Sequence, residues 1–175
     1  MNIFENNYEL QEKQKLECWV FRIAQKKWGI TGRDCIKIFK ENDIFNIITK
    51  DMNMLKESSE DHIVCNIEDI LEKVNAEELN KQKEKIATLQ NKKKAAKPQN
   101  IMYRTRKECR AVNVMRDMIC LLAERKHLSF EKALEKFVKT TMYEALFNYQ
   151  TELWDKKPVC LLGIFDKWNT KKQIT

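Results

Sequence analysis

The chain has 175 residues, with 33 Lys and Arg against 26 Asp and Glu, and only 3 Gly and 2 Pro. This length fits one large domain or two small ones, and the scarcity of Gly and Pro favours helices over turn-rich folds. No run of about 18 apolar residues occurs, so no membrane-spanning helix is expected. The first residues lack the basic start and apolar core of a signal peptide, and we therefore expect a cytoplasmic protein.

The formal net charge of +7 is distributed unevenly along the chain. Residues 1–75 carry 11 basic and 14 acidic side chains, whereas residues 76–110 carry 11 basic and 4 acidic ones. Residues 111–175 carry 11 basic and 8 acidic side chains. The basic charge is thus concentrated in the middle of the chain, which indicates a local electrostatic feature rather than a basic protein throughout.

The stretch at residues 31–55 has an ungapped counterpart at residues 129–153, an offset of 98 residues (129 − 31). The apolar positions coincide in the pairs Ile36 and Leu134, Phe39 and Phe137, Ile44 and Met142, Phe45 and Tyr143, and Ile48 and Leu146. We therefore predict an all-α protein of two tandem small helical modules, about four helices each, related by a duplication. The predicted organisation is a first module at residues 8–75, a Lys-rich linker at 76–101, a second module at 102–168 and a flexible tail at 169–175.

The first module is predicted to begin with a helix over residues 8–28, where apolar side chains recur at three- and four-residue spacing. Gly29 suits the end of this helix, because a C-terminal cap often needs a left-handed residue. Thr31 then suits the N-cap of a short second helix.

The second half of this module is predicted to hold two more helices. Asn42 or Asp43 ends the second helix and caps a third one, which carries residues 44–55. Ser58 and Asp61 have the spacing of a capping box and open the fourth helix.

The Lys-rich linker has few apolar side chains, and a solvated, partly helical tether is its simplest interpretation. An alternative is nucleic-acid binding by residues 92–110, because Lys and Arg neutralise phosphates and a tyrosine can stack on a base. The candidate residues are Lys92, Lys93, Lys94, Tyr103, Arg104, Arg106 and Arg110. Against this, the helix that follows Ser129 carries Glu131, Lys132 and Glu135, and we expect an acidic outer face there that would not suit base recognition.

The second module is predicted to open with a long helix that starts at Arg104. Ser129 caps the helix after it, and Thr140 or Thr141 marks the next break. Pro158 is expected at the first position of the last helix, where its missing N–H costs nothing.

The sequence contains no arrangement typical of a catalytic or metal site. Neither His62 nor His127 has a Cys or an acidic residue at ligand spacing, and no nucleophile or phosphate-loop motif occurs. We therefore expect no enzyme, no metal and no cofactor. Four cysteines lie in apolar helical patterns and are predicted to be buried, reduced thiols: Cys18, Cys35, Cys120 and Cys160.

Large aromatic residues gather in the last helices of the second module. A module this small cannot bury all of them, and exposed aromatics are typical anchors of protein interfaces. The predicted partner-binding residues are Tyr143, Tyr149, Trp154 and Trp168. An equally compatible interpretation is that Trp154 closes the module core beside Leu153.

The pattern WVFRIAQKKWGITGRDCIKIFKENDIFNIITKDMNML, followed by HIVCNIEDIL, resembles a bacterial family of short helical domains of unknown function. Residues 67–70 keep the family's Ile-Glu-Asp-Ile-like end, whereas residues 56–58 depart from its Leu-His-Thr-like turn. The second module looks like a companion group through Thr141, Tyr143, Leu146, Thr151, Leu153 and Trp154.

Such domains are commonly encoded beside genes of ADP-ribosyltransferase-like toxins. The resemblance therefore implies an antitoxin or accessory protein that neutralises such a toxin by direct contact. A regulator that binds nucleic acid through residues 92–110 is the alternative function, and a homo-oligomer is a further open possibility.

Overall fold

The computed structural model describes residues 3–53 and 105–171, together with the single positions 62, 65, 66, 69, 84, 87 and 88. The side chains of residues 3–7 and 168–171 lie outside this description. These residues form helices and turns and no strand, which confirms the all-α class. Within the described part, no helix combines the length and apolar character needed to cross a membrane.

The chain divides into two compact units, unit 1 at Met1–Tyr103 and unit 2 at Arg104–Thr175. Most of the predicted fourth helix of the first module and of the Lys-rich linker lies outside the described residues. The boundaries proposed for these two segments therefore stay predictions.

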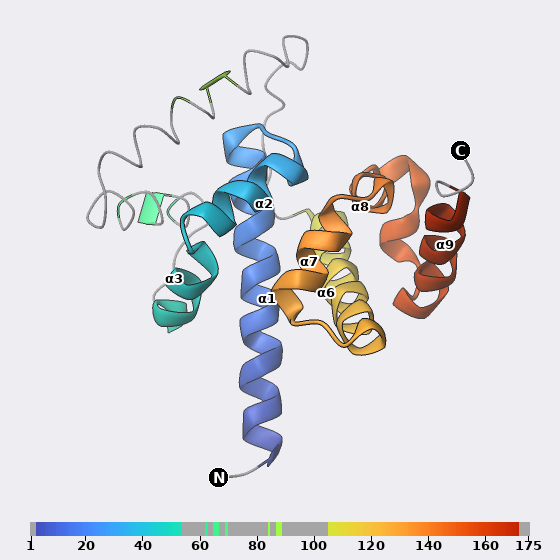
Figure 1. Ribbon diagram of the computed structural model, residues 1–175, viewed down its shortest axis with the longest axis horizontal. Helices are drawn as coiled ribbons and strands as arrows, with labels where there is room; N and C mark the ends of the chain where they lie inside the picture. Colours follow the sequence, from blue (N-terminus) through green and yellow to red (C-terminus); the bar gives the residue numbers. More distant parts are fainter. Residues whose placement is uncertain are drawn as a thin grey trace. The chain divides into compact units, whose positions relative to one another are not determined.

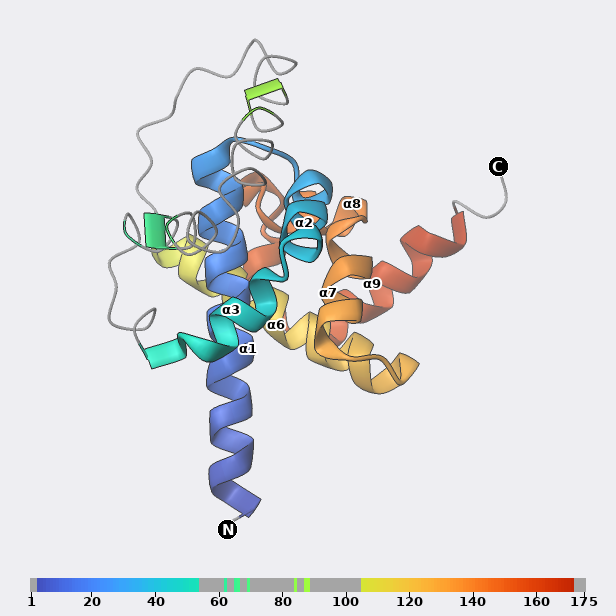
Figure 2. The ribbon, with the colours of Figure 1, turned by 60° about the vertical axis from the view of Figure 1, so that its left-hand side comes forward.

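Unit 1 contains α1 (Ile3–Trp28), α2 (Gly32–Glu41) and α3 (Ile44–Lys50). Figures 1 and 2 show α2 and α3 beside the C-terminal half of α1, whereas the N-terminal half of α1 extends beyond them. Phe39 is fully buried at the centre of this core. Its ring centroid lies 5.2 Å from that of Phe21, 6.3 Å from Trp28 and 5.3 Å from Phe45, in edge-to-face contacts that add to burial.

Unit 2 is made of α6 (Arg106–Lys126), α7 (Phe130–Val138), α8 (Thr141–Leu146), the 3-10 turns η1 (Tyr149–Thr151) and η2 (Leu153–Asp155), and α9 (Pro158–Lys171). Helix α6 packs against α7, α9 and η2. The central ring is that of Phe137, which lies 6.2 Å from the ring of Tyr143 and 6.2 Å from that of Phe165. Phe137 therefore joins α7, α8 and α9 into one core.

Capping residues close in the sequence set where two helices of unit 2 begin. Helix α6 begins at Arg106 rather than at the predicted Arg104, because the Thr105 side chain accepts a hydrogen bond from the backbone N–H of Glu108 at 3.1 Å. Helix α9 begins at Pro158, as predicted.

Both units turn from their long first helix into the second helix with the same backbone geometry. Gly29 and His127 occupy the equivalent left-handed position, with φ of 63° and 50°. The next residue donates its N–H to the carbonyl five positions earlier, over 3.3 Å for Ile30 and 2.9 Å for Leu128. This bond satisfies a carbonyl at the helix end and fixes the direction of the chain.

The helix starts and the core positions that follow also agree at the offset of 98 residues. Thr31 accepts from the N–H of Asp34 at 3.1 Å, and Ser129 accepts from the N–H of Lys132 at 3.4 Å. The five apolar pairs named above are buried in both units. The match also pairs Leu55 with Leu153, of which Leu153 is half-buried and Leu55 lies outside the described residues. The two helix-turn-helix starts are therefore built alike.

The breaks before the third helices lie where they were predicted, but they are not side-chain caps. Asp43 adopts φ 52° and its carboxylate accepts from the side chain of Asn46, at 2.7 and 2.8 Å. In unit 2, the Thr140 hydroxyl donates to the carbonyl of Phe137 at 2.7 Å. Neither side chain caps a backbone N–H of the helix that follows.

The third helix of unit 1 is shorter than predicted, and that of unit 2 is short as well. Helix α3 ends at Lys50, before the predicted end at residue 55. In unit 2, α8 ends at Leu146, where the sequence match continues to residue 153. The chain leaves the helix because the Asn148 side chain accepts from the N–H of Gln150 at 3.2 Å and Glu152 adopts φ 57°.

Replacing His127 with Gly is expected to raise the free energy of unfolding of unit 2 by about 1 kcal/mol, because only Gly takes the left-handed conformation without steric cost. Gly29→Ala should lower that of unit 1 by about the same amount. Urea denaturation measures both changes, and a destabilised His127→Gly variant would contradict the assignment.

Candidate functional site

Aromatic, acidic and basic side chains meet where η1 and η2 pack against the first turns of α6. We call this set the α6 cluster: Lys107, Glu108, Arg110, Tyr149, Trp154 and Asp155. The segment after α8 brings these side chains together. It forms two tight 3-10 turns, η1 and η2, that return the chain to α6.

Glu108 is a charged residue in the interior of unit 2, with 3% of its surface exposed. The hydroxyl of Tyr149 donates a hydrogen bond to its carboxylate. A buried carboxylate needs such donors, because water no longer solvates it. Sequence reasoning missed Glu108, although its spacing from the N-cap Thr105 is that of a capping box and marks Glu108 for notice.

Trp154 is half-buried and is held in place by two contacts. Its Nε1 donates to the carbonyl oxygen of Tyr149 at 3.3 Å, and Nζ of Lys107 lies 5.3 Å from the centre of its ring. The second contact has cation–π geometry. Trp154 therefore both closes the α6 cluster and keeps part of its ring accessible.

Beside it, Arg110 Nε and Asp155 Oδ1 form an ion pair at 2.8 Å. Both side chains are 54% exposed, and such exposed pairs contribute little to stability. The pair therefore orients η2 on α6 more than it stabilises the unit.

The structure does not show Tyr143 and Trp168, two of the predicted partner-binding aromatics, as exposed side chains. Tyr143 has only 1% of its surface exposed and its ring lies edge-to-face with those of Phe137 and Phe147. This burial argues against a partner contact and assigns Tyr143 to the core, because a packed ring presents no surface. Trp168 lies on α9, and its side chain is outside the described residues.

The predicted nucleic-acid residues are described only in part. Arg106 and Arg110 are exposed on the first turns of α6, and Arg110 is engaged by Asp155. The other five candidates lie outside the described residues.

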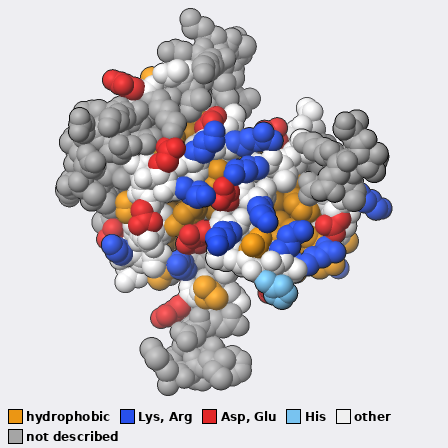
Figure 3. All heavy atoms as spheres, viewed as in Figure 1, with side chains coloured by type: hydrophobic (Ala, Val, Ile, Leu, Met, Phe, Trp, Pro, Cys, Tyr) orange, Lys and Arg blue, Asp and Glu red, His pale blue; other side chains and the backbone are white. Residues whose placement is uncertain are grey.

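The outer face of α7 is mixed rather than acidic, contrary to expectation. Lys132, Lys136 and Lys139 are exposed there with Glu131, and Lys139 pairs with Glu135 at 2.6 Å. The prediction failed because it considered only the first residues of the helix. Figure 3 shows acidic and apolar side chains between the Lys and Arg side chains of the face that it draws.

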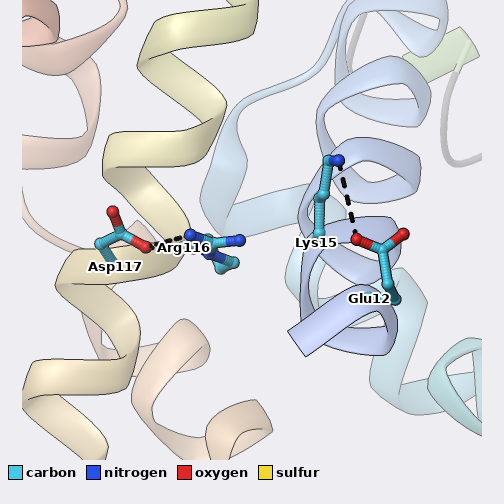
Figure 4. A network of polar contacts seen from close by, with 4 residues as sticks. All are labelled: Glu12, Lys15, Arg116 and Asp117. Atoms are coloured by element: carbon cyan, nitrogen blue, oxygen red, sulfur yellow. Dashed lines mark hydrogen bonds and ion pairs between the residues drawn. The ribbon is translucent and has the colours of Figure 1, made fainter. Parts of the chain in front are cut away.

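Two further ion pairs each join residues within one helix (Figure 4). Glu12 and Lys15 pair at 3.8 Å on α1, and Arg116 and Asp117 pair at 2.5 Å on α6. The first pair has the three-residue spacing that supports a helix, whereas the second joins neighbours along the chain. Among the described residues, no group of three or more His, Cys, Asp or Glu side chains could hold a metal ion.

The cysteines differ in environment. Cys18 and Cys35 are buried, as predicted, and burial raises the pKa of the Cys35 thiol well above its usual value. Cys120 is half-buried, which also raises the pKa of its thiol, and Cys160 is exposed. The prediction of burial is therefore wrong for Cys160, because the face of α9 that carries it is turned away from the core.

Comparisons of the chain with protein-family models, with curated proteins and with solved structures gave no match. The relation to toxin-associated helical domains therefore stays a prediction. The geometry of the α6 cluster is that of a fixed, half-exposed indole beside charged groups, which suits binding.

Proposed function

We propose that this protein is a non-enzymatic protein-binding module whose contact surface in unit 2 includes Trp154. The observation that carries the proposal is the fixed position of this half-buried ring between the Tyr149 carbonyl and Lys107. A large aromatic side chain that is already ordered loses little conformational entropy on binding, and tryptophan is enriched among residues that dominate interface energies.

The resemblance to toxin-associated domains supports a more specific partner. An antitoxin or accessory protein would contact an ADP-ribosyltransferase-like toxin, encoded by a neighbouring gene, and hold it inactive. Lys107 is exposed beside Trp154, so its charge would orient an acidic surface on the partner.

A second candidate function is regulation through nucleic-acid binding. Arg106, Lys107 and Arg110 are exposed on the first turns of α6, which directly follow the basic segment at residues 92–104. This arrangement would track a phosphate backbone. The ion pair of Arg110 with Asp155 offsets one of these basic charges, which favours the protein-binding function as the first candidate.

Trp154→Ala is expected to weaken co-purification of the neighbouring gene product by at least about tenfold, the loss typical of an interface hot spot. Trp154→Phe should reduce co-purification by less, because phenylalanine keeps an aromatic ring in the same place. Lys139→Ala, at the C-cap of α7, serves as the matched surface control and should bind as the unchanged protein does.

Near-ultraviolet circular dichroism must show that each variant keeps its fold. A folded Trp154→Ala variant with unchanged affinity would refute the assignment of the surface. If the protein instead binds duplex DNA or RNA, with an affinity that falls steeply as salt rises and does not respond to Trp154→Ala, the second function is favoured.

We also infer that the two units arose by duplication. The equivalent left-handed turn, the equivalent N-caps and the shared buried positions all agree at one offset of 98 residues, without a gap. Two unrelated amphipathic segments would share apolar spacing, but they would have no reason to share the turn and the caps in the same frame.

A further inference from the structure

Four basic residues around Trp154 come from two segments that lie far apart in the sequence. They are exposed and form no ion pair with another described residue, and we call them the Trp154 rim: Arg106, Lys107, Lys156 and Lys157. Two contacts join the segments. Nζ of Lys107 lies 5.3 Å from the centre of the Trp154 ring, and Arg110 pairs with Asp155 at 2.8 Å. The packing of η2 on α6 therefore gathers positive charge around one indole.

Few negative charges are exposed near the Trp154 rim. Glu108, the acidic residue in the first turns of α6, is 3% exposed and hydrogen-bonded within unit 2, so a ligand at the surface does not reach its carboxylate. Asp155 is offset by Arg110. Glu152, between η1 and η2, and Glu144, on α8, are exposed. The four positive charges of the rim thus exceed the two negative charges that no ion pair offsets.

The Trp154 rim lies beside accessible apolar surface. Trp154 is half-buried, and Val159, two residues after Lys157, is 71% exposed on the first turn of α9. The cation–π contact leaves the charge of Lys107 in place, and an ammonium group has three N–H donors for a ligand. Protein interfaces commonly combine a central aromatic side chain with a polar border.

We infer that the partner binds unit 2 through an acidic segment of its chain, with carboxylates on the Trp154 rim and an apolar side chain on Trp154. This inference rests on the proposed protein-binding function and names the chemistry of the partner. Opposite charges orient the two surfaces and speed their association, whereas burial of the indole supplies most of the affinity.

A nucleic acid is also anionic, but it fits this surface less well. Its phosphates are spaced regularly along the strand, so they would also meet the exposed carboxylates of Glu152 and Asp155. A protein segment can place carboxylates at the lysines and uncharged side chains opposite Glu152. The alternation of basic, acidic and apolar residues around Trp154 therefore favours the protein segment.

The test is a titration of the full chain with a synthetic peptide that has glutamates on both sides of a central phenylalanine. The readout is the indole N–H signal of Trp154 in nuclear magnetic resonance spectra, which is assigned by its loss in Trp154→Phe. The peptide should shift this signal, with an affinity that falls as salt rises, because salt screens exposed charges. The same peptide with glutamines in place of the glutamates should bind at least about tenfold more weakly.

The variant that carries Lys156→Glu and Lys157→Glu should bind the acidic peptide at least about tenfold more weakly than the unchanged chain. The matched control carries Lys132→Glu and Lys136→Glu, which change the net charge equally at exposed positions of α7. Its affinity should change by less than about twofold, because these charges lie outside the rim and are screened. Circular dichroism checks that both variants keep their helices.

Three results would overturn the inference: no binding of the acidic peptide up to about 1 mM, equal binding of the glutamine peptide, or equal losses in the two double variants. Tighter binding of oligothymidylate than of the acidic peptide would also overturn it. If Trp154→Ala weakens binding of the neighbouring gene product and the rim variant does not, the proposed function stands and this inference fails. If only the rim variant weakens that binding, the rim is confirmed and the role proposed for Trp154 is wrong.

Discussion

Replacing Phe137 with Ala is expected to lower the free energy of unfolding of unit 2 by about 3–5 kcal/mol, because the cavity adds to the lost burial. Phe137 is fully buried and contacts the rings of Tyr143 and Phe165, so its loss separates α7 from both α8 and α9. The total stability of a module this small is about 3–5 kcal/mol. We therefore expect unit 2 to be largely unfolded at 37 °C in this variant.

Phe39→Ala is the matched variant in unit 1, where Phe39 contacts Phe21 and Phe45 from the equivalent position. Calorimetry and hydrogen exchange on the full chain measure which unit loses protection. Each variant should remove protection mainly from its own unit. Loss of both units in both variants would show that the two do not fold as separate modules.

Replacing Tyr149 with Phe is expected to destabilise unit 2 by about 1–3 kcal/mol, because the buried carboxylate of Glu108 loses a hydrogen-bond donor. Glu108→Gln should cost less, since a neutral amide needs less solvation than a carboxylate. The double variant should cost less than the sum of the two, because both changes remove the same interaction. Urea denaturation of the four proteins gives this cycle.

Tyr8→Phe is the control for loss of a hydroxyl, and it should have almost no effect because Tyr8 is 67% exposed. Additive costs in the cycle would show that the bond between Tyr149 and Glu108 contributes nothing. Tyr149→Phe should also weaken partner binding. The Tyr149 carbonyl positions Trp154, and it belongs to the turn that the bond to Glu108 anchors.

The sequence by itself determined the helical class and the local geometry of helix ends. The N-caps at Thr31 and Ser129, the turn at Gly29 and the start of α9 at Pro158 involve residues within about five positions of each other. Such interactions depend on side-chain chemistry and spacing along the chain. They were therefore predictable, and so was the agreement between residues 31–48 and 129–146.

Only the tertiary structure decided which aromatic and acidic side chains enter the core. Tyr143 and Tyr149 were both predicted to bind a partner, yet one packs against Phe137 and the other bonds to Glu108, which lies 41 residues earlier. The exposure of Cys160 likewise depends on which side of α9 meets α6 and α7. These outcomes follow from contacts between helices far apart in the chain, and periodicity within one helix carries no information about its neighbour.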